Sequence, residues 1–211
     1  IGAKVMAEII EHCGATSVIT FDLHADQIQG FFNVPVTHIE GKRVFANYIA
    51  SICTENTILC GPDAGSGKRV KRMKDQLAKY HDIHLNYVML DKTRKQANVI
   101  DEMVIIGDVK GKDVIILDDM VDTAGTLCKA AQLLMDKGAN SVRAVVTHPV
   151  LSGKAYENIS NSVLTELLVT DTIPQKQECD KIKVLSVAEL FAKAIGRIRD
   201  HESISSLFIK Y

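Results

Sequence analysis

The chain has 211 residues, of which 46% are hydrophobic and 24% are charged, and its formal net charge is -1. This length predicts one large domain or two small ones, with enough residues for a substantial core. The near-neutral charge excludes the basic footprint expected of a protein that binds nucleic acid or an anionic membrane. Any phosphate chemistry must therefore come from charge placed locally.

The cysteines and the apolar runs of the sequence indicate the cellular compartment in which the protein is expected. The five cysteines are scattered and form no CxxC pair, which favours free thiols in a reducing cytoplasm. No apolar run approaches the ~18 residues of a membrane span, and no signal peptide opens the chain. We therefore expect a cytoplasmic protein. The chain opens with Ile1 inside a predicted helix, so we expect that a longer protein extends further towards the N-terminus.

Helical and strand patterns alternate along the chain. In chain order, the spacing predicts a helix over residues 3–12, a strand over 17–21, a helix over 44–53, a strand over 57–60, a basic helix over 68–80, strands over 85–90, 103–108 and 114–117, a helix over 126–136, strands over 141–147 and 163–169, and a helix over 187–199. This order, with continuous Val, Ile and Leu in the strands, predicts an α/β fold with a mostly parallel sheet covered on both faces.

Four of the predicted strands end in polar turns. These turns are residues 22–24 (DLH), 62–67 (PDAGSG), 91–95 (DKTRK) and 118–126 (DDMVDTAGT). In a parallel sheet, ligands bind beyond the carboxyl ends of the strands. One such turn is compatible with chance, but four together predict a binding site.

The turn at residues 118–126 contains two kinds of group. Its second half is rich in small residues whose backbone N–H groups can converge on an anion, and Thr123 and Thr126 add hydroxyl donors, which suits a phosphate monoester. Its three carboxylates would repel phosphate and suit sugar hydroxyls or a hydrated Mg²⁺ instead. A sugar phosphate satisfies both halves, whereas an N-capped helix start with solvated acids is the simpler alternative.

The other three turns are less specific. Residues 61–69 (GPDAGSGKR) lack the glycine spacing of a Walker A motif, but they can cradle a diphosphate or form a plain glycine turn. Asp22 and His24 share one side of a strand and could hold a divalent metal, although a lone His is more often structural. Residues 91–98 (DKTRKQAN) form a solvated charge run or a mobile basic lid over transferring phosphates. The basic helix predicted over 68–80 is either a solvated face or a regulatory phosphate site at a subunit contact.

These motifs together resemble one family. DDMVDTAGT resembles the ribose-phosphate-binding loop of the type I phosphoribosyltransferase fold, in the form found in ribose-phosphate diphosphokinases, also called phosphoribosyl pyrophosphate synthetases. DLHADQIQGFF resembles a second signature of that family, and the similarity continues through PDAGSGKR, KTRKQAN, VTHPVLSG and ESISSLF. It covers essentially the whole chain, which corresponds to the C-terminal two-thirds of the family's proteins.

The resemblance implies roles for individual residues. Lys92 and Arg94 are implied to be catalytic, with Lys95 secondary, on a flexible loop. The residues implied to bind ribose 5-phosphate are Asp118, Asp119, Asp122, Thr123, Ala124, Gly125 and Thr126. The residues of the implied diphosphate loop are Asp63, Ala64, Gly65 and Ser66. The implied cofactor is Mg²⁺, as Mg-ATP, held by His24 with Asp22 and Asp63. The family often has acids where this chain has Asn33 and Thr37, so no metal role is inferred for those positions.

The implied reaction is transfer of the β,γ-diphosphoryl group of ATP to the 1-hydroxyl of ribose 5-phosphate. Three alternatives are weaker. An unrelated nucleotide-binding regulator with a doubly wound sheet would not predict polar turns at four strand ends. A salvage phosphoribosyltransferase has no evident need for DLHADQIQGFF or a KTRK lid, and a catalytically silent regulatory subunit should have lost ribose-loop acids or lid cations. The family forms hexamers that share an adenine site between subunits, so the resemblance implies a homo-oligomer and leaves open whether this chain is active alone.

The resemblance also implies two similar α/β domains, the first of them incomplete. Residues 1–40 are expected to be the remnant of the N-terminal domain, to which residues 184–211 return. Residues 41–183 are expected to form the C-terminal domain, which carries the ribose 5-phosphate site.

Overall fold

The computed structural model describes residues 1–93 and 102–204. In chain order the elements are α1 (Gly2–His12), β1 (Val18–Phe21), the 3-10 helix η1 (Asp26–Phe31), β2 (Val36–Ile39), α2 (Lys42–Ile52), β3 (Thr57–Gly61), the 3-10 turn η2 (Ala64–Ser66), α3 (Gly67–His81), β4 (Asn86–Thr93), β5 (Glu102–Ile106), β6 (Asp113–Val121), α4 (Gly125–Asp136), β7 (Ser141–Pro149), α5 (Ala155–Asn161), β8 (Glu166–Thr170), β9 (Ile182–Leu185) and α6 (Ala188–Arg199).

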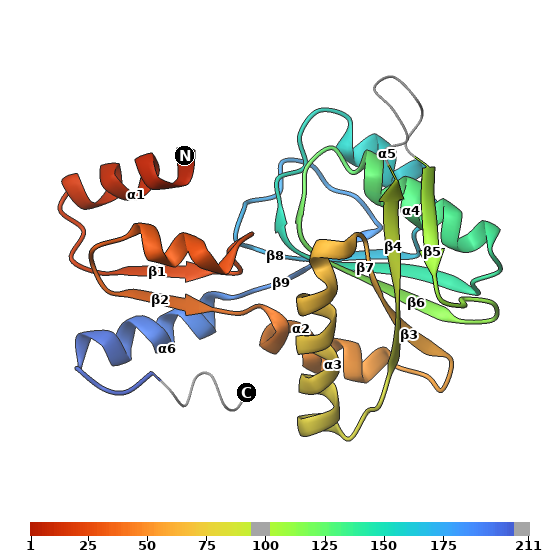
Figure 1. Cartoon of the computed structure of the whole chain (residues 1–211), viewed down its shortest axis with the longest axis horizontal. Coiled ribbons are helices and arrows are strands. Elements are labelled where there is room, and N and C mark those ends of the chain that lie inside the picture. The colour runs from red at the N-terminus through yellow and green to blue at the C-terminus, as the bar shows by residue number, and fades with distance from the viewer. Residues whose placement is uncertain (94–101, 205–211) are drawn as a thin grey trace.

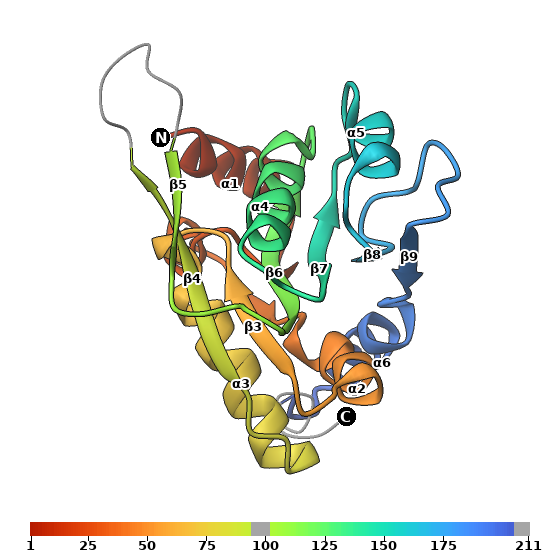
Figure 2. The same cartoon turned by 90° about the vertical axis from the view of Figure 1, so that its right-hand side faces the viewer.

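Most of the chain is organised around one large sheet with the strand order β5-β4-β3-β6-β7-β8-β9. Its neighbouring strands are parallel, except that β5 pairs antiparallel with β4. Helices α4 and α5 lie on one side of the sheet, and α2 and α3 lie on the other (Figures 1 and 2). The predicted α/β class with a mostly parallel, doubly covered sheet is confirmed.

The two faces of the sheet bury separate cores because successive strand residues point to opposite sides. On β6, Ile116 packs in the cluster that contains Leu134 of α4. Its neighbour Ile115 packs in the cluster that contains Ile49 of α2 and Met73 of α3. A strand that is buried on both faces reads as a continuous apolar run, which is the pattern seen at residues 114–117.

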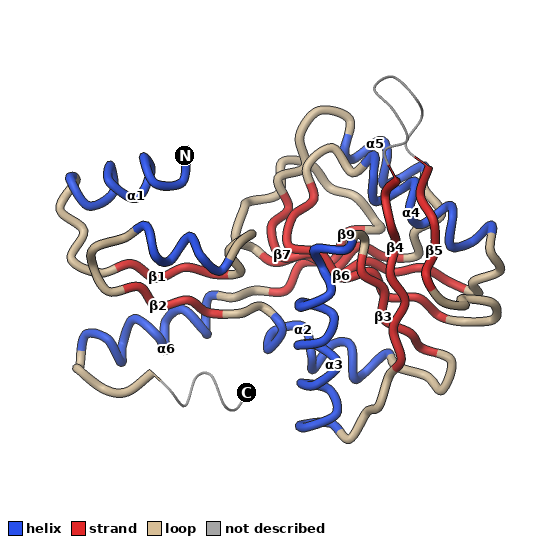
Figure 3. The backbone as a smooth tube through the Cα atoms, in the orientation of Figure 1, coloured by secondary structure: helices blue, strands red, loops and turns tan. Residues whose placement is uncertain are grey.

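A second, two-stranded sheet of β1 and β2 lies beside the large one (Figures 1 and 3). The strands are parallel, with Phe21 opposite Ile39 at their carboxyl ends. These two side chains share a buried cluster with Val187, Leu190 and Ala194, so the last helix packs under the first sheet. The domain boundaries at residues 40 and 184 stay a prediction, which this packing makes testable.

The strand boundaries differ from those predicted. Asp118 and Asp119 lie within β6 rather than after it, because β6 continues to pair with β7 through Asp118 opposite Val146 and Met120 opposite His148. Likewise β4 extends through Thr93, so Lys92 lies on a strand opposite Met103 and not on a turn. The elements η1, β2, α5 and β9 were not predicted, since each is short and carries little periodic signal.

Candidate functional site

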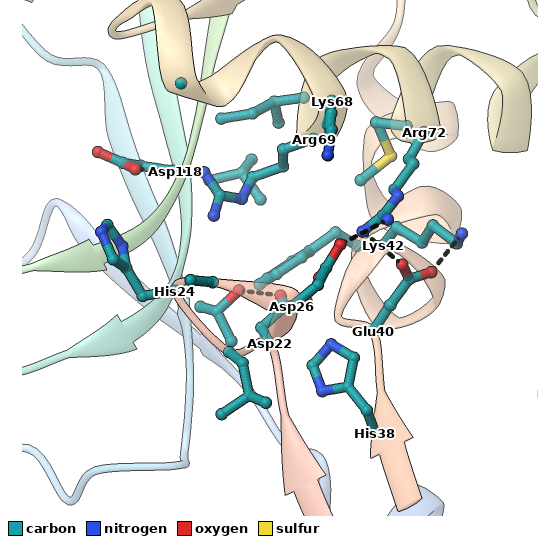
Figure 4. A pocket seen from close by; sticks show the side chains of 18 of the residues that line it. Asp22, His24, Asp26, His38, Glu40, Lys42, Lys68, Arg69, Arg72 and Asp118 are labelled. Atoms are coloured by element: carbon teal, nitrogen blue, oxygen red, sulfur yellow. Dashed lines mark hydrogen bonds and ion pairs between the residues drawn. The ribbon is translucent and has the colours of Figure 1, made fainter. Parts of the chain in front are cut away.

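A cavity of about 430 Å³ lies where the carboxyl ends of β1 and β2 face those of β6 and β7. The start of α3 and the turn η2 form another wall, through Ala64, Gly65 and Arg69. Figure 4 shows His24, Arg69 and Asp118 towards one end and Lys42, Glu40 and Arg72 towards the other. Three of the four predicted turns therefore contribute to one cavity, although they are far apart in the sequence.

The turn after β1 meets the acids of β6 directly. Nδ1 of His24 lies 2.8 Å from Oδ2 of Asp119. Asp119 is almost fully buried, with a 6% exposed side chain, whereas the His24 side chain is 77% exposed. A buried carboxylate needs a partner, and here one partner is an imidazole that stays accessible to a ligand.

Arg69 of α3 is the second partner of these acids. Its guanidinium lies 3.1 Å from Oδ1 of Asp119 and 3.5 Å from Oδ1 of Asp118. Burial alone would raise the pKa of Asp119, but Arg69 and His24 outweigh it, so that pKa is lowered. Burial and the neighbouring Asp119 raise the pKa of Asp118 to about 7. The acid pair thus has too little positive charge around it when no ligand is present.

The loop between β6 and α4 has the shape of an anion cradle. Ala124 adopts the left-handed conformation at φ 60°, and α4 begins at Gly125 with no side-chain cap on its N-terminal amides. A side chain added at Gly125 would meet only Thr123 Oγ1 at 3.8 Å, so the approach to those amides is open. Thr123 and Thr126 are exposed, and the Ser152 hydroxyl donates to the Asp122 carboxylate. Such a helix start suits a phosphate.

The turn after β3 is a capped 3-10 turn. The backbone N–H of Ser66 donates to the Asp63 carboxylate at 2.9 Å, and the Ser66 hydroxyl donates to the Asp63 carbonyl at 2.5 Å. Ala64 and Gly65 are exposed and line the cavity. Asp63 therefore shapes the turn, while the small residues beside it leave room for a ligand.

The far end of the cavity is held by an ion-pair network. Arg72 lies 2.9 Å from Asp26 of η1 and 2.8 Å from Glu40, and Lys42 also pairs with Glu40. The hydrogen bond from Arg72 lowers the pKa of Asp26 despite partial burial. Together with Arg69, Arg72 shows that part of the basic helix lines the cavity and forms ion pairs there.

Sequence reasoning missed Arg69 and Arg72 as site residues. Their three-residue spacing places them on one face of α3, and Val70 and Met73 beside them are buried. That pattern was an available signal, but the surrounding lysines obscured it.

The remaining predicted residues are placed as follows. The Lys92 backbone lies on β4, while its side chain, Arg94 and Lys95 lie outside the described residues. The Asp22 carboxylate lines the cavity and accepts from the Thr147 hydroxyl at 2.5 Å. As far as the described part of the chain goes, the lining includes Asp118 but no residue from Asp122 to Thr126, so the loop predicted to bind the phosphate is not part of the cavity lining.

The donor groups fit Mg²⁺ only together with a substrate. Within residues 1–93 and 102–204, no group of three or more His, Cys, Asp and Glu side chains is arranged to hold a metal ion. His24, Asp22 and Asp63 are thus not gathered as a complete ligand set. Mg²⁺ is commonly held by one or two carboxylates plus phosphate oxygens. Asp118 and Asp119 can provide the carboxylates, and a substrate would provide the phosphate oxygens. None of the described helices has the length and apolar content to cross a bilayer.

Comparison with known proteins gives consistent results. Residues 66–209 match the family described as the phosphoribosyl synthetase-associated domain. Over 209 residues, 99% of this chain and 66% of the relative, the chain is 52% identical to a ribose-phosphate pyrophosphokinase of Wolinella succinogenes. It is 50% identical to a protein of the same name from Helicobacter hepaticus over 99% of this chain and 65% of the relative.

A solved structure is also similar. The crystal structure of phosphoribosylpyrophosphate synthetase from Mycobacterium smegmatis aligns with a TM-score of 0.84 and 32% identity, covering 95% of this chain and 64% of that one. The chain thus spans about two thirds of the length of the relatives that it matches.

Proposed function

The chain belongs to the phosphoribosyl synthetase family, and from this premise we propose that the full-length protein is a ribose-phosphate diphosphokinase. In this reaction the 1-hydroxyl of ribose 5-phosphate attacks the β-phosphorus of ATP. The bond from that phosphorus to the oxygen shared with the α-phosphorus breaks, AMP leaves, and phosphoribosyl diphosphate forms. A cytoplasmic location and self-association into a homo-oligomer are parts of the same proposal.

The contact between His24 and Asp119 carries this proposal. It brings the DLH turn to the acids of the DDMVDTAGT motif at 2.8 Å, and Arg69 from the GPDAGSGKR motif binds the same acids. For two phosphorylated substrates to react, the turns that bind them must lie no further apart than the length of one substrate molecule. Such transfers depend on alignment and charge neutralisation and need no covalent nucleophile from the protein.

Ribose 5-phosphate is assigned to the end of β6 and the start of α4. The loop from Asp122 to Thr126, with Thr123, Ala124 and Gly125, would bind the 5-phosphate through the open amides of α4 and the threonine hydroxyls. Asp118 and Asp119 would accept hydrogen bonds from the ribose hydroxyls or hold them through Mg²⁺. This orients the 1-hydroxyl towards the cavity.

ATP is assigned to the cavity side. The turn formed by Asp63, Ala64, Gly65 and Ser66 would receive the diphosphate, and His24, Asp22 and Asp63 are proposed to approach the phosphates of Mg-ATP. In support of this, Asp22, His24, Ala64 and Gly65 line the cavity. When bound, Mg²⁺ supplies positive charge to the phosphates and to the two acids. Lys92 and Arg94 are proposed to stabilise negative charge on the migrating group.

The direct test incubates the full-length protein with Mg-ATP and ribose 5-phosphate and measures AMP. We expect AMP only when both substrates are present. Consumption of phosphoribosyl diphosphate with a nucleobase and without ATP, with release of diphosphate, would indicate a salvage phosphoribosyltransferase. No turnover of either kind would indicate a silent subunit.

Substrate binding to this chain tests the sugar site separately. Because hydrogen bonds to charged groups are strong, we expect Thr126→Val to weaken ribose 5-phosphate binding by about tenfold or more in calorimetry. Thr165→Val, which changes an exposed threonine before β8, is the matched control and should bind as the parent does. Equal affinities for both variants would contradict the assignment of the 5-phosphate to this loop.

A further inference from the structure

His24 reaches Asp119 from an exposed turn, so its own packing does not hold it there. Its side chain is 77% exposed. The 2.8 Å separation from Asp119 must therefore be set by the backbone that precedes it, which is the turn at Asp22 after β1. The contacts that hold the backbone of Asp22 in place therefore also determine the position of His24.

Asp22 has an unfavourable backbone conformation. Its φ is 44°, a left-handed value that costs energy for a residue with a side chain. Such a conformation persists only when surrounding contacts over-determine it. The Asp22 N–H donates to the Ile39 carbonyl at 2.9 Å, which accounts for one contact within the small sheet.

The other contacts come from the large sheet. The Thr147 hydroxyl donates to the Asp22 carboxylate at 2.5 Å, and Thr147 is only 1% exposed. Nε2 of His148 lies 3.1 Å from the Asp22 carbonyl and 3.0 Å from the Phe21 carbonyl. Two adjacent residues of β7 therefore bind both the side chain and the backbone at the end of β1.

Both ring nitrogens of His148 have polar neighbours. Nε2 faces two carbonyl acceptors, so it carries the proton and donates. Nδ1 lies 3.0 Å from the Thr172 hydroxyl oxygen. Phe21 packs edge-on against the ring at a centroid distance of 6.5 Å. The ring is oriented from both sides.

We propose that Thr147 and His148 form a latch that positions His24 against Asp119. His148 lies opposite Met120, which follows Asp119 on β6. Thr147 and His148 on β7 and Asp119 on β6 therefore belong to the same pair of neighbouring strands. The latch holds the DLH turn at a set distance from that acid. Both are positioning residues, and the proposal deepens the proposed function because His24 is assigned there to the phosphates of Mg-ATP.

Hydrogen exchange tests the latch without any activity measurement. We expect Thr147→Val and His148→Leu to raise amide exchange across residues 22–25 by about tenfold or more, on the scale of a lost hydrogen bond to a charged group. Thr147→Ser and His148→Gln retain a donor and should restore protection. Thr57→Val removes another buried threonine hydroxyl at the opposite end of the sheet and is the matched control.

Turnover of the full-length protein gives the second readout. Thr147→Val and His148→Leu should lower kcat by about tenfold in the parent but by less than about twofold in a His24→Ala background, because residues that act through one another are not additive. Affinity for ribose 5-phosphate should change less than kcat does, since none of the side-chain hydrogen bonds described for Thr147 and His148 reaches the 5-phosphate loop at residues 122–126.

The outcomes separate the two proposals. Unchanged exchange at residues 22–25, or an equal rise throughout β3 and β6, would overturn the latch. Additive losses of kcat, or full turnover by His24→Ala, would also overturn it. Absence of AMP from the parent protein would overturn the proposed function, while the exchange data would still decide whether the latch exists.

Discussion

Asp118 and Asp119 are neighbours in the chain, yet the pKa values of their carboxyl groups are shifted in opposite directions. Asp119 receives Arg69 and His24, which lower its pKa in spite of burial. Asp118 is left with burial and with the charge of Asp119, which raise its pKa to about 7. Although the two residues are adjacent, Asp119 is therefore a carboxylate, whereas Asp118 titrates near neutral pH.

The shift at Asp118 predicts a pH dependence of stability in Mg²⁺-free buffer. The folded protein keeps this proton to about pH 7, whereas an unfolded chain loses it near 3.8. The folded state thus binds more protons in between, so the free energy of unfolding should fall as the pH rises from about 4 to about 7. Urea denaturation across this range should show a weaker fall for Asp118→Asn, while Glu178→Gln, an exposed control, should behave as the parent does.

Arg69 is expected to stabilise the apo protein through the acid pair. Arg69→Met removes the guanidinium partner of the nearly buried Asp119, and we expect a loss of about 1–3 kcal/mol in the free energy of unfolding. Lys71→Met, two residues away and exposed, should change it by less than about 0.5 kcal/mol. Denaturant titrations of the two variants compare these values directly, and equal effects would exclude a specific role for Arg69.

At the scale of elements, the start of α2 is closely packed against the end of β1. A Cβ added at Gly41 would overlap the Asp22 carboxylate and would lie 3.2 Å from both Phe45 and Thr147. The backbone at Gly41 has φ -65°, so the requirement is for space and not for a left-handed conformation. This glycine lets three elements approach one another around Asp22.

Gly41→Ala should therefore destabilise the protein, by about 1–3 kcal/mol as expected for overpacking. Gly196→Ala is the control, because nothing lies within 4 Å of its added Cβ on α6. In that helix, alanine should stabilise by about 0.5–1 kcal/mol. Thermal or chemical denaturation should give opposite signs for the two substitutions. A neutral or stabilising effect of Gly41→Ala would show that Asp22 can move aside at low cost.

The end of β4 is the element assigned to phosphoryl transfer. If Lys92 stabilises charge on the migrating group, Lys92→Ala should lower turnover of the full-length protein by about 10²-fold or more, with substrate binding changed only a few-fold. Lys129→Ala, an exposed substitution on α4, is the control. Steady-state kinetics would contradict the assignment if Lys92→Ala kept turnover within a few-fold of the parent.

At the scale of the molecule, the site lies between two sheets and depends on both. The β1–β2 sheet contributes His24 and Asp22, while the large sheet contributes Asp118, Asp119 and Thr147. The small sheet is in turn supported by α6, whose Leu190 is 4% exposed and packs in the cluster around Phe21. The last helix of the described chain therefore supports one wall of the cavity.

Leu190→Ala should loosen the small sheet selectively. The lost burial and the cavity are expected to cost about 2–4 kcal/mol, and hydrogen exchange should rise in β1 and β2 while β3 and β6 stay protected. Leu134→Ala on α4, a fully buried control, should act on the large sheet instead. Uniform exchange across both sheets in Leu190→Ala would contradict the two-domain prediction.

Local pattern was sufficient for the class of fold and for three of the turns that line the cavity. Strands such as residues 114–117 are buried on both faces and therefore read as unbroken apolar runs, and turns at their ends carry conspicuous acids and glycines. The same pattern missed β2 and β9, which are four-residue strands held by pairing with a neighbour. It also placed the end of β6 too early, because pairing with β7 keeps Asp118 and Asp119 in the strand.

Contacts between distant segments required the folded chain. That acids, small residues and hydroxyls follow the strands is a property of residue order, and it was enough to suggest a sugar-phosphate site. That Arg69 binds Asp118 and Asp119, that His24 reaches Asp119, and that Thr147 holds Asp22 depends on which strands become neighbours. Periodicity reports the environment along one element, whereas a site is made by the pairing of elements that are far apart in the chain.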